Sequence, residues 1–330
     1  MTRAATLLIT ILLVVLTSGG RATAQQQVVV AVIGAPGTPE YGAQFGQWAD
    51  TWKQACSKGG ATFIAIGLDE SKDVSDKARL EEVLAERSQE TLTALWLILI
   101  GHGTFDGRTA KFNLRGPDVA ANELADWLRP LQSPVAVVNA ASASAPFLKE
   151  LSASGRVVIT ATKSGFEQNY TRFGEFLAEA IVQPAADLDK DGQTSLLEAF
   201  LTASHRVSEF YTAAGRLATE HALLDDNGDG LGTPADWFQG IRPVQRARDG
   251  AALDGYRAHQ FCLLYSKTEA RIPPDLRAKR NQLELEVMKL RDAKDQIPES
   301  VYYPRLEALL YEIAHIYEQI DVPTGASGDS

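Results

Sequence analysis

Hydrophobic residues gather in five short runs along the first half of the chain, each bounded by turn-forming residues. The runs are rich in β-branched residues and almost continuously apolar, which is typical of strands buried on both faces of a sheet. The five predicted strands span Val28–Ile33, Thr62–Gly67, Leu95–Ile100, Val135–Val138 and Arg156–Thr160.

Segments with the helical spacing of apolar residues separate these strands. They span Tyr41–Ala55, Ser75–Arg87, Ala120–Leu131 and, after the fifth strand, Thr171–Val182. Alternation of buried strands with helices predicts an α/β fold, in which a mostly parallel sheet is covered by helices on both faces. Ligands of such sheets bind beyond the carboxyl ends of the strands, so candidate chemistry is expected there.

A helical hairpin is predicted at the C-terminal end, from 272 to 320. Leu283, Val287 and Leu290 recur at helical spacing, and a second group follows Pro298. Internal packing and an interface for oligomerisation or another partner both remain open for this hairpin. The second group consists of Leu306, Leu309, Leu310, Ile313, Ile316 and Tyr317.

The polar tail, 321–330, is expected to be disordered.

The N-terminal residues have the pattern of a secretory signal peptide, residues 1–24. Arg3 precedes an apolar run, Ala4–Leu16, and Ala22 and Ala24 form a small-residue cleavage pattern. This run is shorter than the ~20 residues that span a bilayer, and no later segment is long enough. We therefore expect export to the periplasm or the extracellular space, without membrane contact after cleavage.

Composition narrows the choice of partners. The chain has 330 residues, 45% of them hydrophobic, as in ordinary globular proteins. Its 42 acidic and 32 basic residues give a net charge of −10, so nucleic acid is not an expected partner. Cys56 and Cys262 can form at most one disulfide, and only if their Cα atoms lie within ~4.4 to 6.8 Å.

The sequence from Asp187 to Glu198, here loop one, matches the twelve-residue EF-hand calcium loop at every ligand position. Ca²⁺ prefers ~6 to 8 oxygen ligands, and Gly192 permits the sharp turn at position six. An acidic solvated loop is the alternative. The expected ligands are Asp187, Asp189, Asp191, the carbonyl of Gln193, a water held by Ser195, and a bidentate Glu198.

A second candidate calcium loop, loop two, runs from Asp225 to Asp236. It begins at a distance from loop one that is compatible with two paired EF-hand loops. Asp236 is shorter than glutamate at position twelve, and Pro234 disturbs the start of a following helix. The expected ligands are Asp225, Asn227, Asp229, the carbonyl of Leu231, Thr233 and Asp236.

Polar residues follow the third and fourth predicted strands. The third ends as LWLILIGHG, which places His102 just past the sheet, where it could act as a general acid or base. The fourth ends as VAVVNAASASAPF, which places Asn139, Ser142 and Ser144 at the same edge. After the fifth strand, Lys163 and Glu167 add to this crevice, as a specificity pocket or an ordinary polar loop.

Over about Gln27 to Ala180, this pattern resembles the legumain-like and caspase-like cysteine peptidases. The resemblance rests on a hydrophobic strand closing in His-Gly, on a small-residue turn closing the next strand, and on the intervening FNLRGPDVAANELADWL. It implies an αβα sandwich in which His102 is the general acid/base. It also implies a cysteine nucleophile at the end of the fourth strand, where this chain has Ala141 or, if the register slips by one, Ser142.

Three interpretations of the crevice remain. A peptidase fold without catalytic activity could bind a protein or peptide, with the crevice bounded by His102, Asn139, Ala141, Ser142 and Lys163. A hydrolase could use Ser142 or Ser144 with His102 and a backbone oxyanion hole that includes the Gly103 N–H. The polar residues could instead only cap strand ends.

The predicted organisation is thus a caspase-like α/β sandwich that carries an EF-hand-like helix-loop-helix insertion and a C-terminal helical hairpin. Its parts are the signal peptide (1–24), the α/β domain (25–186), the calcium-binding region (187–240), a segment that connects or completes the α/β domain (241–271), the hairpin (272–320) and the tail (321–330).

Overall fold

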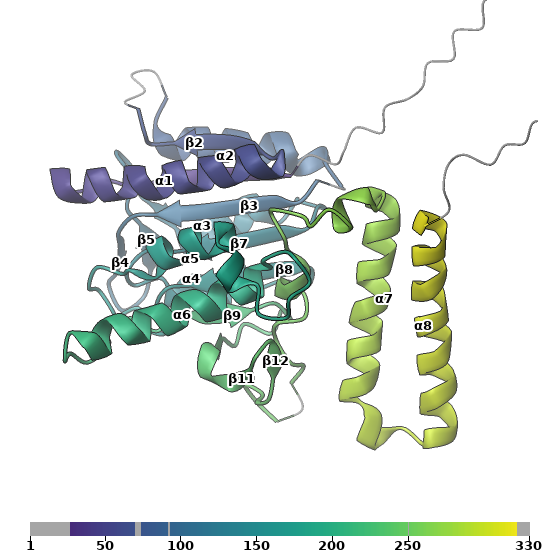
Figure 1. Ribbon diagram of the computed structural model, residues 1–330. Coiled ribbons are helices and arrows are strands. Elements are labelled where there is room, and N and C mark those ends of the chain that lie inside the picture. Colours follow the sequence, from purple (N-terminus) through teal and green to yellow (C-terminus); the bar gives the residue numbers. More distant parts are fainter. Residues whose placement is uncertain (1–26, 70–73, 92, 250, 322–330) are drawn as a thin grey trace, which may run out of the picture.

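The computed structural model of the protein describes residues 27–69, 74–91, 93–249 and 251–321 (Figure 1). The predicted signal peptide and all but the first residue of the predicted tail lie outside this range. No helix within it is both long and apolar enough to cross a membrane.

A seven-stranded sheet with the order β10-β9-β8-β7-β3-β1-β2 forms the centre of the protein. The five strands from β2 to β8 in this order are parallel, whereas β9 runs antiparallel to β8 and β10 antiparallel to β9. The prediction of a mostly parallel α/β fold is therefore confirmed. The strands are β1 (Val28–Ile33), β2 (Thr62–Ile66), β3 (Leu95–Ile100), β7 (Val135–Asn139), β8 (Arg156–Thr160), β9 (Leu223–Asp225) and β10 (Thr233–Pro234).

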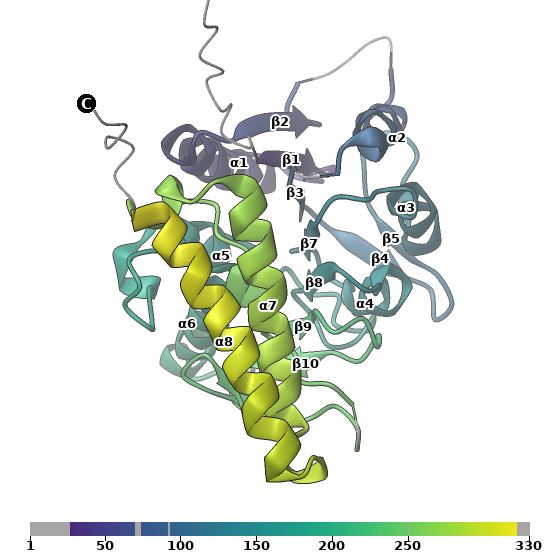
Figure 2. The ribbon, with the colours of Figure 1, turned by 90° about the vertical axis from the view of Figure 1, so that its right-hand side faces the viewer.

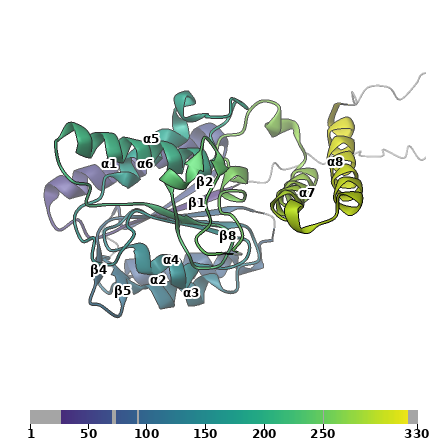
Figure 3. The same cartoon turned by 90° about the horizontal axis from the view of Figure 1, so that it is seen from below.

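Helices cover both faces of this sheet (Figure 3). Alternate residues of a strand point to opposite faces, so Val29 and Ala31 enter one core and Val28 and Val30 the other. The first core is closed by α1 (Pro39–Gly59), α5 (Phe173–Val182) and α6 (Leu196–Ala213), and the second by α2 (Asp76–Glu86), α3 (Ala121–Leu128) and α4 (Ala145–Leu151).

Short elements complete the described part of the chain. A three-stranded antiparallel sheet of β4 (Gly103–Phe105), β5 (Ala110–Phe112) and β6 (Val119–Ala120) follows β3, and β11 (Phe238–Gln239) pairs with β12 (Arg242–Pro243). Single 3₁₀ turns span Arg87–Gln89, Pro184–Ala186, Ala235–Trp237, Ala258–Gln260, Glu269–Arg271 and Lys294–Gln296.

Within 187–240, α6, β9 and β10 belong to the α/β sandwich, so these elements do not form a separate insertion. Leu224 is fully buried and pairs with Ile159 of β8, so β9 extends the central sheet, and α6 lies on its face. The sequence pattern misses these strands because two or three residues are too few to show a periodicity.

The C-terminal hairpin consists of α7 (Pro274–Asp292) and α8 (Glu299–Asp321), and α7 lies between α8 and the sandwich (Figures 1 and 3). Figure 2 shows the two helices crossing one end of the sandwich. The hairpin base is the first part of α7 together with the turn Glu269–Arg271 that precedes it. There the guanidinium of Arg280 donates to both carboxylate oxygens of Glu269, at 2.6 and 2.8 Å. Tyr303, Leu310 and Tyr311 on α8 are exposed.

Shortening a buried side chain of β3 tests the assignment of the core. Leu97 on β3 is fully buried, so Leu97→Ala should lower the free energy of unfolding by about 2 to 5 kcal/mol through lost burial and a residual cavity. The matched control is Leu217→Ala, since Leu217 is 91% exposed, and its change should stay within about 0.5 kcal/mol. Urea unfolding measures both, and equal losses would contradict the core assignment.

Candidate functional site

His102 lies at the carboxyl end of β3, inside a group of aromatic rings. Its ring centroid is 4.8 Å from that of Tyr41, 5.3 Å from Phe45 and 6.4 Å from Tyr170. The Nε2 atom is 3.2 Å from the carbonyl oxygen of Pro36, and the residue is half-buried. The imidazole is therefore held by α1 and by the segment before α5, at the edge where the sequence places it.

Ser142 contacts the neighbouring strand end but not the histidine. Its Oγ accepts from the N–H of Gly103 and donates to the carbonyl of the same residue, both at 3.2 Å. Gly103 lies so close that a Cβ atom there would be 2.3 Å from the Ser142 carbonyl oxygen. The N–H expected to face an oxyanion is thus engaged by a hydroxyl. Among the described residues, no hydrogen bond joins the His102 ring to Ser142 or Ser144.

The other residues after β7 serve the turn itself. Ala141 is 1% exposed and belongs to the core beneath α3 and α4, and its N–H donates to Asn139 Oδ1 at 3.1 Å. Ser144 Oγ lies 3.1 Å from Thr162 Oγ1 and accepts from the Thr162 N–H at 3.2 Å. Ala143 has a φ of 52°, a left-handed conformation that is uncommon for alanine. Most polar groups of this buried turn are thus hydrogen-bonded within the turn or to adjacent segments, whereas Asn139 Nδ2 is buried without a partner.

Lys163 lies beyond this turn, on a groove of about 500 Å³ beside α6. Its backbone N–H donates to Glu167 Oε2 at 2.9 Å, and the other carboxylate oxygen of Glu167 is 2.6 Å from Nδ1 of His221. The sequence pattern did not single out His221, because only the folded chain brings it next to Glu167. Neither His102 nor Ser142 lines this groove, so it does not join Lys163 to them.

Loop one brings its carboxylates together. One oxygen from each of Asp187, Asp189 and Asp191 lies within 4.8 Å of the others. Asp187 Oδ2 accepts from the N–H of Gly192 at 3.1 Å, whereas its Oδ1 is buried without a hydrogen-bond partner. Such an orphaned carboxylate oxygen fits a loop that holds a cation.

Glu198 at position twelve folds back onto the start of loop one. Its Oε1 accepts from the N–H groups of Leu188 and Asp189, at 2.7 and 3.3 Å. Its Oε2 accepts from the N–H and the hydroxyl of Ser195, both at 2.8 Å, which forms the capping box of α6. The carboxylate is 1% exposed and is fixed from both ends of the loop.

Negative charge in loop one is only partly compensated. Burial raises the pKa of Asp191, and the carboxylates of Asp189 and Glu198 raise it further. Nε2 of His259 lies 3.0 Å from Asp189 Oδ2, the one imidazole that the described residues bring to this loop. A divalent cation would neutralise the remaining charge.

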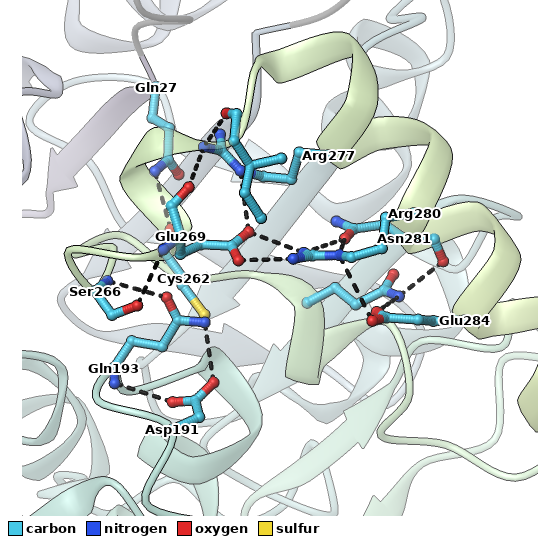
Figure 4. Close-up of polar contacts among 12 residues, drawn as sticks. Gln27, Asp191, Gln193, Cys262, Ser266, Glu269, Arg277, Arg280, Asn281 and Glu284 are labelled. Carbon is cyan, nitrogen blue, oxygen red and sulfur yellow. Dashed lines mark hydrogen bonds and ion pairs between the residues drawn. The ribbon is translucent and has the colours of Figure 1, made fainter. Parts of the chain in front are cut away.

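Loop one is also connected to the base of the C-terminal hairpin (Figure 4). Gln193 Nε2 donates to Asp191 Oδ2 at 3.0 Å, and its Oε1 accepts from the Ser266 N–H at 3.2 Å. Ser266 Oγ in turn accepts from the N–H of Glu269, which pairs with Arg280 of α7. Polar contacts therefore run continuously from the loop to the hairpin.

Loop two differs from the expected paired EF-hand. It lies between β9 and β10, which pair with each other, and no helix leads into it or directly out of it. Asp236 is exposed in the 3₁₀ turn after β10, where it lines the groove of Lys163. Because β10 begins at position nine and this turn follows it, no α-helix forms there to hold position twelve over the loop. A residue that the pattern missed, Asp254, contacts loop two instead.

Both cysteines are free and buried. Burial raises the pKa of Cys56 to about 12 and the pKa of Cys262 well above its ordinary value. Neither thiol therefore resembles an activated nucleophile.

Comparisons with known proteins give only remote structural likeness. No protein-family model and no curated protein matches the chain. The similar solved structures include the Drosophila initiator caspase Dronc (15% identity over 64% of this chain and 82% of that one, TM-score 0.42). They also include caspase-1 from Spodoptera frugiperda (8% identity, 61% of this chain and 86% of that one, TM-score 0.39). A third is Raptor from Chaetomium thermophilum (10% identity, 91% of this chain and 26% of that one, TM-score 0.33). These scores carry no argument about function.

The contacts of Ser142 predict a structural role for its hydroxyl. Ser142→Ala leaves a backbone N–H and a carbonyl of Gly103 without that partner, so the free energy of unfolding should fall by about 1 to 3 kcal/mol. Ser57→Ala on the exposed side of α1 is the matched control, with a change within about 0.5 kcal/mol. Chemical denaturation measures both, and an unchanged stability of Ser142→Ala would argue against this role.

Proposed function

We propose that the chain is an exported calcium-binding protein built on a caspase- or legumain-like sandwich, whose degenerate peptidase crevice binds a protein or peptide. The observation that carries the proposal is the convergence of three loop-one carboxylates, with a buried and unpartnered oxygen of Asp187 among them. Carboxylate and carbonyl oxygens are the ligands that Ca²⁺ prefers.

Loop one offers enough oxygens for a calcium ion. Asp187, Asp189 and Asp191 would each contribute a carboxylate, Gln193 its carbonyl, Ser195 a bound water and Glu198 both carboxylate oxygens. When bound, the ion supplies positive charge where the chain has little. It would also cross-link the α5–α6 connection, which Gln193 already joins to Ser266.

The position of loop one supports a structural role for the ion. Ser195, at position nine of the loop, bridges to Cys262, and the neighbouring Phe261 packs on Trp96 near the start of β3. His102 lies at the opposite, carboxyl end of β3. Calcium would therefore stabilise the fold and the hairpin base, not act on a substrate in the crevice.

Three features support the degeneracy of the crevice. Ala141 offers no nucleophile and is buried, and the Ser142 hydroxyl is engaged by Gly103. Ser144 is 1% exposed and bonded to Thr162. The alternative, a hydrolase that uses His102 with Ser142 or Ser144, requires one of these hydroxyls to leave its present partners. Exposed groups for binding a peptide are nevertheless available, since Phe166 is 73% exposed beside Lys163.

Calcium binding predicts a thermal shift that depends on Glu198. With a dissociation constant of about 10⁻⁴ M, about 10 mM calcium should stabilise the fold by about 2.7 kcal/mol and raise its Tm by roughly 3 to 5 °C. Glu198→Gln should abolish most of this shift, because it removes a carboxylate oxygen from position twelve. Differential scanning calorimetry with and without calcium measures the shift.

The control for this variant is Glu209→Gln, since Glu209 is exposed on the same helix and away from the loop. It should keep the wild-type shift. The difference between calcium and calcium-free scans separates binding from any loss of the α6 cap. A wild-type protein with no shift and no heat of binding at millimolar calcium would reject the proposal.

Degeneracy of the crevice predicts that a fluorophosphonate probe does not label the calcium-loaded protein and that a diverse peptide library is not cleaved. Ala141→Cys places a thiol at the position that resembles the family's nucleophile, and weak cleavage regained by this variant would support the alignment. Turnover by the wild type that is lost in both His102→Ala and Ser142→Ala would instead establish the hydrolase.

A further inference from the structure

Loop two repeats three internal hydrogen bonds of loop one and adds one, from the N–H of Gly228 to Asp225 Oδ1 at 2.9 Å. In both loops the carboxylate at position one accepts from the glycine N–H at position six, at 3.1 Å for Asp187 and 2.9 Å for Asp225. The side chains at positions three and five each accept from the N–H two residues later, at 2.8 Å for both Asn227 and Asp229. The two loops therefore share this turn geometry, although strands flank one and helices the other. The buried oxygen without a hydrogen-bond partner belongs to Asp187 in loop one and to Asp229 in loop two.

The contacts of position twelve also recur, but in loop two they come from Asp254. Its Oδ1 accepts from the N–H groups of Asp226 and Asn227, at 2.9 and 3.1 Å, which are positions two and three. Its Oδ2 accepts from the hydroxyl of Thr233 at position nine, at 2.6 Å. Glu198 makes the corresponding three contacts in loop one, whereas Asp236 makes none of them.

Asp226 explains how a distant segment reaches this place. It is 5% exposed, its Oδ1 accepts from the N–H of Gly255 at 2.9 Å, and its Oδ2 accepts from those of Arg257 and Ala258, both at 2.7 Å. The second aspartate of loop two thus anchors the segment directly after Asp254. Together with the hydrogen bond from Asn227 Nδ2 to the carbonyl of Ala252 at 3.0 Å, this anchor holds the Asp254 carboxylate beside the loop.

In the described part of the chain, no basic side chain pairs with the carboxylates in and beside loop two. Asp225 and Asp254 are 1% and 2% exposed, and neither they nor Asp229 form an ion pair with a lysine or arginine in the described part of the chain. Asp229 Oδ2 is buried and has no hydrogen-bond partner. Buried carboxylates are costly unless hydrogen bonds and an opposite charge or a metal compensate them, so these oxygens point to a bound cation.

We propose that loop two binds a second calcium ion and that Asp254, which lies 18 residues after Asp236, provides the carboxylate that Glu198 provides in loop one. The other ligands are Asp225, Asn227, Asp229, the carbonyl of Leu231 and Thr233. Among the described residues, one oxygen from each of Asp187, Asp189 and Asp191 lies within 4.8 Å of the others, whereas Asp225, Asp229 and Asp254 form no such group. Binding would therefore draw the Asp254 side chain inward, and loop two is the weaker site.

The test counts calcium ions in a protein whose first loop is disabled. Glu198→Gln removes loop one, so isothermal titration of this variant with calcium should report one remaining site. Adding Asp254→Asn should weaken that site by about tenfold or more, as expected for loss of a ligand. Adding Asp236→Asn, the matched control, removes one acidic group at the position that the sequence pattern assigns, and should leave the affinity unchanged.

Asp254 is buried, so a second variant guards against misfolding. Asp229→Asn in the Glu198→Gln background changes a less buried ligand of the same site and should also weaken binding by about tenfold or more. Circular dichroism without calcium checks that each variant is folded.

The proposal is overturned if the Glu198→Gln protein binds no calcium, or if Asp236→Asn weakens its site while Asp254→Asn does not. The proposal for loop one fails separately, if the wild type and Glu198→Gln bind the same number of ions with the same affinity.

Discussion

A single buried carboxylate, that of Asp226, joins the parts of the chain that its sequence keeps apart. Three backbone N–H groups from residues 255–258 donate to it. Without this carboxylate, each N–H would lack that partner near the amino ends of the parallel strands. The segment that follows then reaches loop one, where the carbonyl of Phe261 accepts from Leu196 at 2.7 Å. Both candidate calcium loops therefore depend on how this one segment is held.

The same segment continues to the first strands and the hairpin. Gln27 Nε2 donates to the carbonyl of Cys262 at 2.9 Å, and Gln27 Oε1 accepts from the indole of Trp96 at 2.8 Å. Glu269 then meets Arg277 and Arg280 of α7 at the base of the hairpin (Figure 4). These ion pairs and hydrogen bonds thus lie near the amino ends of the parallel strands, while His102 and its aromatic neighbours lie at the carboxyl ends. The sheet separates the two regions.

The parallel strands and the convergence of the loop-one aspartates could be predicted from the sequence, because each depends on neighbouring residues. Leu95–Ile100 is buried on both faces, so its apolar run coincides with β3. All the candidate ligands of loop one lie within twelve residues. Asp254 could not be found in this way, because nothing near it in the sequence marks its contact with Thr233. Pairing with β8 likewise defines β9, whose three residues carry no pattern of their own.

At the other end of the sheet, Ser142 determines what the crevice can accept. Its hydroxyl joins the turn after β7 to the peptide of Gly103, at the N–H that a carbonyl oxygen of a ligand would otherwise approach. A ligand that used this N–H would have to displace the hydroxyl and leave it without a partner in a buried place. Lys163 and Phe166, by contrast, are exposed on the loop after β8. Contact with a ligand is therefore favoured along that loop and beside His102, and disfavoured at the position where acyl transfer would require an oxyanion to be held.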